Sequence, residues 1–297
     1  MKQSLVLGVL LAAGCDTTMT GNSGNLELSY THGGLFESVS NPIGAGLMAD
    51  VVIRQLGAED PLQIDAAESS DTTILTVSSL DGTRMDLLAG SAGEAVLSVD
   101  AEGLSDAFDI TVEDIASVSY GAIVYGQEDD VIAAGAALWV PRTVTGESGS
   151  ELTGYGLAMP QIAPLDSAIG LEDGAIGATL VEFSQPGEIQ LSDGIGEART
   201  YTVIDGADVS WTVDDGVSEE ASLSVGETPL LLLSGVDSEG RNVLGSLSSI
   251  DDATCTVEAL LGSAEIYMVS ALAAGECEIA LNGNTDEPYL SLVIDAE

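Results

Sequence analysis

Apolar and polar residues alternate along many short stretches of the chain, the pattern of half-buried β-strands. In FDITV (108–112), Phe, Ile and Val alternate with Asp and Thr, which gives a strand one apolar and one polar face. Turn residues interrupt such stretches in LSVDAEGL (97–104) and SGVDSEGRNV (234–243), as in hairpins. No segment after about residue 25 shows the long 3.6-residue period of a capped helix. The pattern therefore predicts an all-β protein.

Three short patterns recur in the same order along the chain. They are LELSY (26–30), ASVSY (116–120) and ADVSW (207–211); then AGEAVLSV (92–99), PGEIQLS (186–192) and AGECEIAL (274–281); then ITVED (110–114), YTVID (201–205) and SLVID (291–295). The aromatic residues that end the first pattern are Tyr30, Tyr120 and Trp211, which lie 90 and 91 positions apart. The repeats predict three domains, at 25–114, 115–206 and 207–297.

The third of these domains is similar to the bacterial immunoglobulin-like repeats of surface and secreted proteins. Residues 251–281 match that family's run of strand, turn, strand, then AAG and a final strand. The resemblance extends over about 25–296 and is weakest in the middle of the second domain. It implies three tandem immunoglobulin-like antiparallel β-sandwiches, and this family has no shared catalytic residues.

The same resemblance bears on two of the three cysteines. The family often carries one cysteine in each of the strands that Cys255 and Cys277 occupy here. The resemblance thus implies a disulfide between these two residues, which would persist in an oxidising compartment. Two buried free thiols are the alternative.

The chain opens MKQSLVLGVLLAAGC. Its apolar run is shorter than the roughly 20 residues that cross a bilayer, and LLAAGC resembles the lipobox of bacterial lipoproteins. This implies a signal peptide at 1–14, a lipidated Cys15 and a flexible tether over 15–24. An ordinary secretory signal with a chance cysteine is the alternative. The resemblance implies general export and a lipid-anchored protein of the bacterial cell envelope, with the outer membrane or cell surface favoured over the inner membrane.

Charge narrows the set of partners. The chain has 6 basic and 49 acidic residues, a net charge of −43, which repels nucleic acid phosphates. Dispersed acids favour adaptation to salty water over specific cation sites. Acids at the domain junctions could nevertheless supply oxygen ligands for calcium. These are Glu113, Asp114, Asp205 and Asp208, to which QEDD (127–130) and DDGVSEE (214–220) could add ligands.

The sequence gives little indication of a catalytic site. His32 is the only histidine, and no nucleophile elbow, zinc-protease motif or phosphate loop is present. Trp211 falls at the repeat position of two tyrosines and is interpreted as structural. Trp139, in AALWVP (136–141), is interpreted as a core residue, although an exposed row of aromatics would suggest sugar binding.

The sequence therefore predicts a lipid-anchored envelope protein with tandem immunoglobulin-like repeats, acting as a structural, adhesive or binding module. We expect no enzyme activity and no cofactor, calcium aside. The expected partners are the membrane, through the lipid, and an extracellular or envelope protein or glycan. The alternative function is a carbohydrate-binding or accessory module for capture of extracellular polymers.

Overall fold

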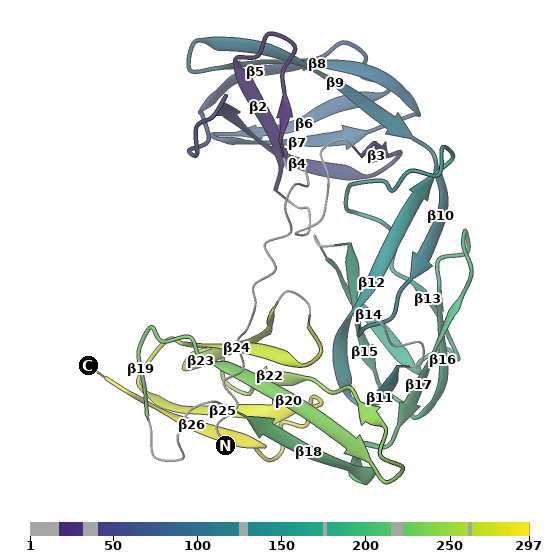
Figure 1. Cartoon of the computed structure of the whole chain (residues 1–297), viewed down its shortest axis with the longest axis vertical. Coiled ribbons are helices and arrows are strands. Elements are labelled where there is room, and N and C mark those ends of the chain that lie inside the picture. The colour runs from purple at the N-terminus through teal and green to yellow at the C-terminus, as the bar shows by residue number, and fades with distance from the viewer. Residues whose placement is uncertain are drawn as a thin grey trace, which may run out of the picture. The chain divides into compact units, whose positions relative to one another are not determined.

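The computed structural model describes residues 18–31, 41–124, 130–174, 177–214, 222–260 and 263–296. Strands dominate these residues, as Figure 1 shows. A short 3-10 turn at Gly206–Asp208 is the helical element named among them. No helix in this part of the chain is long and apolar enough to cross a membrane. The all-β prediction is confirmed.

The first stretch of the chain forms two sheets. Its strands are β1 (Met19–Thr20), β2 (Leu26–Tyr30), β3 (Ile43–Gly44), β4 (Met48–Gln55), β5 (Ile64–Ser69), β6 (Leu75–Asp81), β7 (Arg84–Ala89), β8 (Gly93–Ala101) and β9 (Leu104–Glu113). One sheet has the order β1-β2-β4-β7-β6, and the other has the order β3-β9-β8-β5.

The second stretch repeats this arrangement. Its strands are β10 (Ile115–Tyr120), β11 (Val131–Ala133), β12 (Ala136–Gly146), β13 (Gln161–Ala163), β14 (Ala168–Gly174), β15 (Ala178–Phe183), β16 (Gly187–Ser192) and β17 (Arg199–Ile204). Its sheets have the orders β10-β12-β15-β14 and β11-β17-β16-β13.

The third stretch has the same arrangement of two sheets. Its strands are β18 (Val209–Asp214), β19 (Leu223–Ser224), β20 (Leu230–Asp237), β21 (Asn242–Val243), β22 (Leu247–Ser249), β23 (Cys255–Ala259), β24 (Ile266–Ala271), β25 (Gly275–Leu281) and β26 (Leu290–Asp295). Its sheets have the orders β18-β20-β24-β23 and β19-β26-β25-β22, and β21 pairs with β20.

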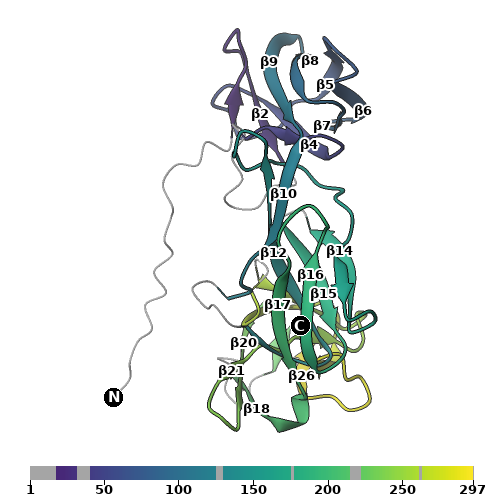
Figure 2. The same ribbon diagram turned by 90° about the vertical axis from the view of Figure 1, so that its right-hand side faces the viewer.

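Strand pairing is antiparallel except where one short strand begins the second sheet of each stretch. There β3 runs parallel to β9, β11 to β17 and β19 to β26. Figure 2 shows the strands from the side.

The sequence repeats fall at equivalent places in this topology. Tyr30 and Tyr120 end β2 and β10, and the recurring glycines Gly93, Gly187 and Gly275 begin β8, β16 and β25. These glycines have φ values of +156°, +139° and +150°, which side-chain-bearing residues rarely adopt. The backbone at the start of this strand therefore explains why glycine recurs there.

Contacts divide the chain into two compact units. Unit 1 holds residues up to Ile115 together with Gly146–Tyr155, and unit 2 holds Ala116–Thr145 and the chain from Gly156 onward. Unit 2 therefore contains the sheets of the second and third stretches. The boundaries at 25–114, 115–206 and 207–297 stay a prediction.

Gly146–Tyr155 begins at the last residue of β12 but packs within unit 1. The N–H of Gly44 donates to the carbonyl of Thr153 (3.0 Å), and Met48 and Tyr155 exchange backbone hydrogen bonds of 2.9 Å in both directions. The Tyr155 hydroxyl also donates to Asp50 (2.6 Å). Burial and this carboxylate raise the pKa of Tyr155. The chain thus passes between the two units at 115/116, 145/146 and 155/156.

The tether predicted over 15–24 is wrong for its second half. β1 pairs antiparallel with β2, and the buried carboxylate of Asp106 accepts hydrogen bonds from the N–H groups of Ser23 (2.7 Å) and Asn25 (2.8 Å). Burial raises the pKa of Asp106, but hydrogen bonds from backbone N–H groups outweigh this and hold it below its usual value. Small polar residues suit a tight turn as well as a tether, so composition could not separate the two.

Candidate interaction surface

A sheet with one face on the core normally turns a polar face to water. Unit 1 follows this rule in part in the sheet of β4 and β7, where Asp50 lies opposite Asp86 and the exposed Arg84 lies opposite Val52, which is buried. One apolar pair, Met48 opposite Leu88, lies farther along the same strands.

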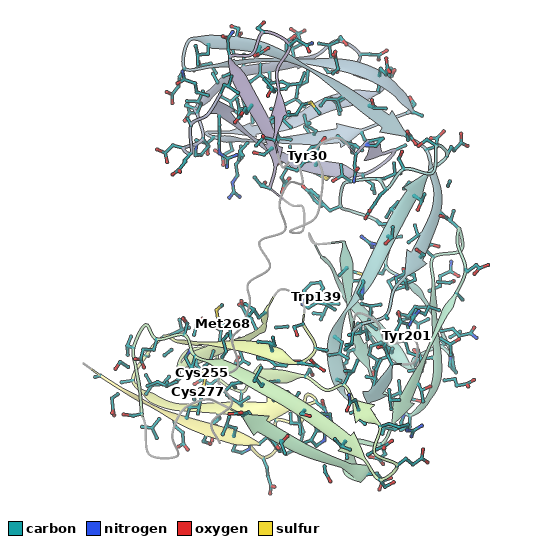
Figure 3. All side chains as sticks on the ribbon, in the orientation of Figure 1. Tyr30, Trp139, Tyr201, Cys255, Met268 and Cys277 are labelled. Atoms are coloured by element: carbon teal, nitrogen blue, oxygen red, sulfur yellow. A yellow bond between two sulfur atoms is a disulfide. The ribbon has the colours of Figure 1, made fainter. Side chains whose placement is uncertain are left out.

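The sheet of β20 and β24 departs from the rule. Along β20, Leu230 and Leu232 are 42% and 44% exposed, whereas Leu231 and Leu233, which alternate with them, are buried. The outward side chains thus face away from the core. Across the sheet, Leu230 lies opposite Met268 and Leu232 opposite Ile266, and both partners are half-buried. We call Leu230, Leu232, Ile266 and Met268 the outer apolar face; Figure 3 labels Met268 on β24.

Acidic residues flank this face on both sides. On β18, Asp214 lies opposite Leu232, and on β23, Glu258 lies opposite Met268. Both acids are exposed. A strip of apolar side chains therefore lies between two strands, each of which places one acid beside it.

The core below the outer apolar face is formed by buried residues of both sheets. These residues are Leu223, Leu231, Leu233, Leu247, Cys255, Tyr267, Val269, Ala271, Cys277, Ile279 and Ile294. The Tyr267 hydroxyl donates to the carbonyl of Gly245 (2.9 Å), which satisfies a polar group inside the core. Leu230 and Leu232 are not part of this core cluster.

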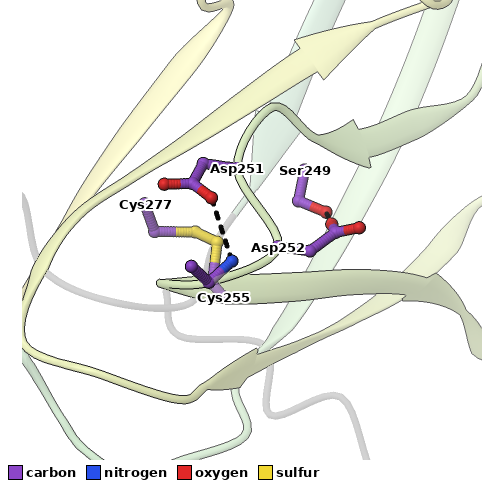
Figure 4. Close-up of a disulfide and its surroundings, with 6 residues drawn as sticks. Ser249, Asp251, Asp252, Cys255 and Cys277 are labelled. Atoms are coloured by element: carbon purple, nitrogen blue, oxygen red, sulfur yellow. Dashed lines mark hydrogen bonds between the residues drawn. A yellow bond between two sulfur atoms is a disulfide. The ribbon is translucent and has the colours of Figure 1, made fainter.

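The disulfide prediction is confirmed. Cys255 of β23 and Cys277 of β25 are bonded, with Cα atoms 5.6 Å apart and no exposed surface. The bond joins the two sheets of the third stretch. In the turn before β23, Asp251 accepts a hydrogen bond from the N–H of Ala253 (3.0 Å), and Ser249 donates to Asp252 (Figure 4).

The two tryptophans behave differently. Trp211 is half-buried and packs against the core of the third stretch. A Cβ placed on Gly235 would lie 2.5 Å from its ring, so the glycine makes room for the indole and the structural interpretation is confirmed. Trp139 alternates with the buried Leu138 and Val140 and is only half-buried.

The core interpretation of Trp139 is therefore wrong, because its neighbours on both sides point inward. Trp139 lies opposite Leu180 on β15. Ile169 on β14 is 52% exposed and lies opposite Glu182. The outward orientation of Trp139 could not be predicted from the sequence, because apolar residues occupy both faces of the strand.

The acids predicted to bind calcium are placed as follows. Glu113 ends β9 and accepts a hydrogen bond from the Ser148 hydroxyl (2.8 Å), and Asp114 follows it. Asp205 caps the 3-10 turn, accepting from the N–H of Ala207 (3.0 Å), and Asp208 lies in that turn.

In the described ranges no three His, Cys, Asp or Glu side chains are grouped to hold a metal ion. Calcium binding at the four acids therefore stays a prediction. Most of the flanking acidic runs QEDD and DDGVSEE lies outside the described residues, as do Cys15 and His32.

Comparison with known proteins gives structural neighbours only. No family model matches the chain, and no curated protein matches it. Domains 4–9 of the surface layer protein SbsC are similar at 14% identity and a TM-score of 0.28, over 92% of this chain and 47% of that one.

Two other solved structures show comparable similarity. Invasin, a bacterial integrin-binding protein, matches at 12% identity and a TM-score of 0.24, over 91% of this chain and 60% of its own. An endo-fucoidan hydrolase of glycoside hydrolase family 107 matches at 14% identity and a TM-score of 0.25, over 94% of this chain and 44% of its own. The chain thus spans less than two thirds of each of these structures.

Proposed function

We propose that the chain is a lipid-anchored protein of the bacterial cell envelope whose tandem immunoglobulin-like repeats serve as a non-catalytic binding module. The observation that carries the proposal is the outer apolar face of β20 and β24. Exposed clusters of large apolar residues on a soluble surface are characteristic of interaction sites. Lipid on Cys15 would hold the protein to the membrane, and the repeats would present this face.

The disulfide supports export. Such bonds form and persist in the periplasm and outside the cell and are rare in the reducing cytosol. The buried Cys255–Cys277 bond is thus consistent with passage through the export pathway, which the leader LLAAGC predicts.

The joint inside unit 2 supports a presenting role. The N–H of Ala133 donates to the carbonyl of Leu244 (2.9 Å), and the N–H of Leu244 donates to the carbonyl of Val131 (2.8 Å). Ala133 and Val243 share an apolar cluster there. Backbone hydrogen bonds and apolar packing at the joint suit a module that holds a surface in place.

Anchoring is tested by labelling cells with an alkyne analogue of palmitate. The native chain should carry the label in the membrane fraction, and Cys15→Ala should abolish labelling and leave an uncut leader. Label on the Cys15→Ala variant, or an unlabelled native chain in membranes, contradicts the anchor.

Binding is tested separately with the soluble chain from residue 16 onward. Fluorescently labelled protein should bind native envelope fractions saturably, and unlabelled protein should compete. Non-saturable binding contradicts the module.

A second candidate, carbohydrate binding, is favoured by Trp139. Its half-buried indole lies on the outward face of β12, and an aromatic face can stack on a sugar ring. A glycan array is the test: binding of a polysaccharide that Trp139→Ala abolishes would favour this function over protein binding.

A further inference from the structure

The third stretch differs from the first in a way that the fold does not require. β4 and β20 hold the same place in their sheets, as do β7 and β24. Outward positions on the first pair of strands include Asp50 opposite Asp86, whereas the outer apolar face occupies the second pair. The first pair also carries one apolar pair, Met48 opposite Leu88, but the fold forms there with charged residues beside it. The paired outward positions of β20 and β24 carry no charged residue, so their apolar character is not a requirement of the topology.

The side chains of this face are arranged to meet a partner together. Leu232 lies opposite Ile266, and Leu230 lies opposite Met268 on the same strands. Directly opposed side chains on one face of a sheet are in contact distance. The face is therefore continuous across two strands, and its centre loses water when a complementary surface covers it.

Charge selects the class of partner. Asp214 and Glu258 flank the apolar strip on opposite sides, and the chain carries a net charge of −43. A second copy of the chain or an anionic partner would place like charges in contact, which costs several kcal/mol across an interface. A partner with cationic side chains at both edges of an aliphatic centre matches both the apolar strip and the acids that flank it.

We infer that the outer apolar face docks a basic amphipathic protein segment, with aliphatic side chains against Leu230, Leu232, Ile266 and Met268 and Lys or Arg against Asp214 and Glu258. The inference rests on the proposed binding function and names its site and partner class. It does not depend on lipid anchoring, which the labelling experiment tests separately.

The test uses the full mature chain with Cys15→Ser and a synthetic peptide of alternating leucine and lysine. Two further peptides replace either every lysine by glutamate or every leucine by serine. Fluorescence anisotropy measures affinity at low and high NaCl. The leucine–lysine peptide should bind most tightly, and its affinity should fall with salt.

Variants locate the site. Leu232→Thr keeps a residue that favours strands and should weaken binding about three- to ninefold, since somewhat under half of a leucine side chain is exposed for burial. Ile266→Thr should act in the same direction. Val293→Thr is the matched control: Val293 is 58% exposed on β26, in the other sheet, and its substitution should leave affinity unchanged. Glu258→Gln should reduce the salt dependence.

Equal affinities of the native chain, Leu232→Thr and Val293→Thr would overturn the inference, as would equal binding of the leucine–lysine and serine–lysine peptides. Sedimentation velocity tests the other possible occupant of the face, a second copy of the chain. Self-association that Leu232→Thr abolishes would assign the face to a second copy and overturn the basic partner. Unfolding curves of each variant accompany the measurements, so that a loss of binding is compared only among folded proteins.

Discussion

Reduction of the Cys255–Cys277 bond should weaken the third stretch selectively. The bond closes a loop of 22 residues' separation. In the chain-entropy model, a loop of this size restricts the unfolded chain enough to stabilise the folded state by about 3 kcal/mol. With an m-value of about 1–3 kcal/mol/M in urea, the unfolding midpoint should fall by about 1–3 M.

The assay follows tryptophan fluorescence during unfolding in urea. Urea is uncharged, so it leaves the screening between the charges of the protein unchanged. Trp139→Phe makes Trp211 the sole tryptophan, and Trp211 packs against the core that contains both cysteines. Cys15→Ser removes the third thiol. Curves are recorded with and without reductant, and alkylation followed by intact mass reports whether Cys255 and Cys277 are free.

An unchanged midpoint in protein that mass spectrometry shows to be fully reduced would refute the reasoning. The sample without reductant is a second check, because two alkylatable thiols there would show that the bond does not form. The reciprocal variant Trp211→Phe leaves Trp139 to report on the second stretch, where reduction should have a smaller effect.

Three further predictions concern unit 1, a repeated glycine and charge. Asp106→Asn should destabilise unit 1 by about 1.5–3 kcal/mol, the range for a hydrogen bond to a charged group. The folded-state pKa of Asp106 is lowered, so its stabilisation is present above the unfolded pKa and is lost as pH falls toward the folded one; acid titration of stability should be shallower in the variant. Gly187→Ala should cost about 1–3 kcal/mol in thermal unfolding, because φ is +139° and no atom lies near the added Cβ; an unchanged melting temperature contradicts this. Melting temperature should rise with NaCl as salt screens the net charge of −43, whereas an equal rise with micromolar calcium would indicate specific sites instead.

Much of the fold could be predicted because the repeated units carry alternating patterns. FDITV (108–112) lies within β9, and the recurring AGE or PGE segment marks the same strand start in β8, β16 and β25. Both signals are local, since strand period and backbone conformation are written in neighbouring residues. The disulfide could be predicted only from the resemblance to bacterial immunoglobulin-like repeats.

The candidate site was not predictable for a physical reason. LLLL (230–233) has no alternation, so sequence cannot say which leucines face the core. The structure shows that Leu231 and Leu233 do and that Leu230 and Leu232 do not. AALWVP (136–141) hides the orientation of Trp139 in the same way. Two-residue strands such as β3 are set by contacts with distant residues and have no pattern of their own.

The position of Gly146–Tyr155 bears on how such a protein can evolve. Repeats that are strung end to end can be duplicated, lost or exchanged by recombination at their boundaries. A gene segment that ends at residue 114 would lack Thr153 and Tyr155, so the backbone groups of Gly44 and Met48 would lose their partners. Asp50 would also lose the tyrosine hydroxyl. The first two repeats are thus expected to be inherited together, and the backbone hydrogen bonds of Val131 and Ala133 with Leu244 extend the same constraint to the third.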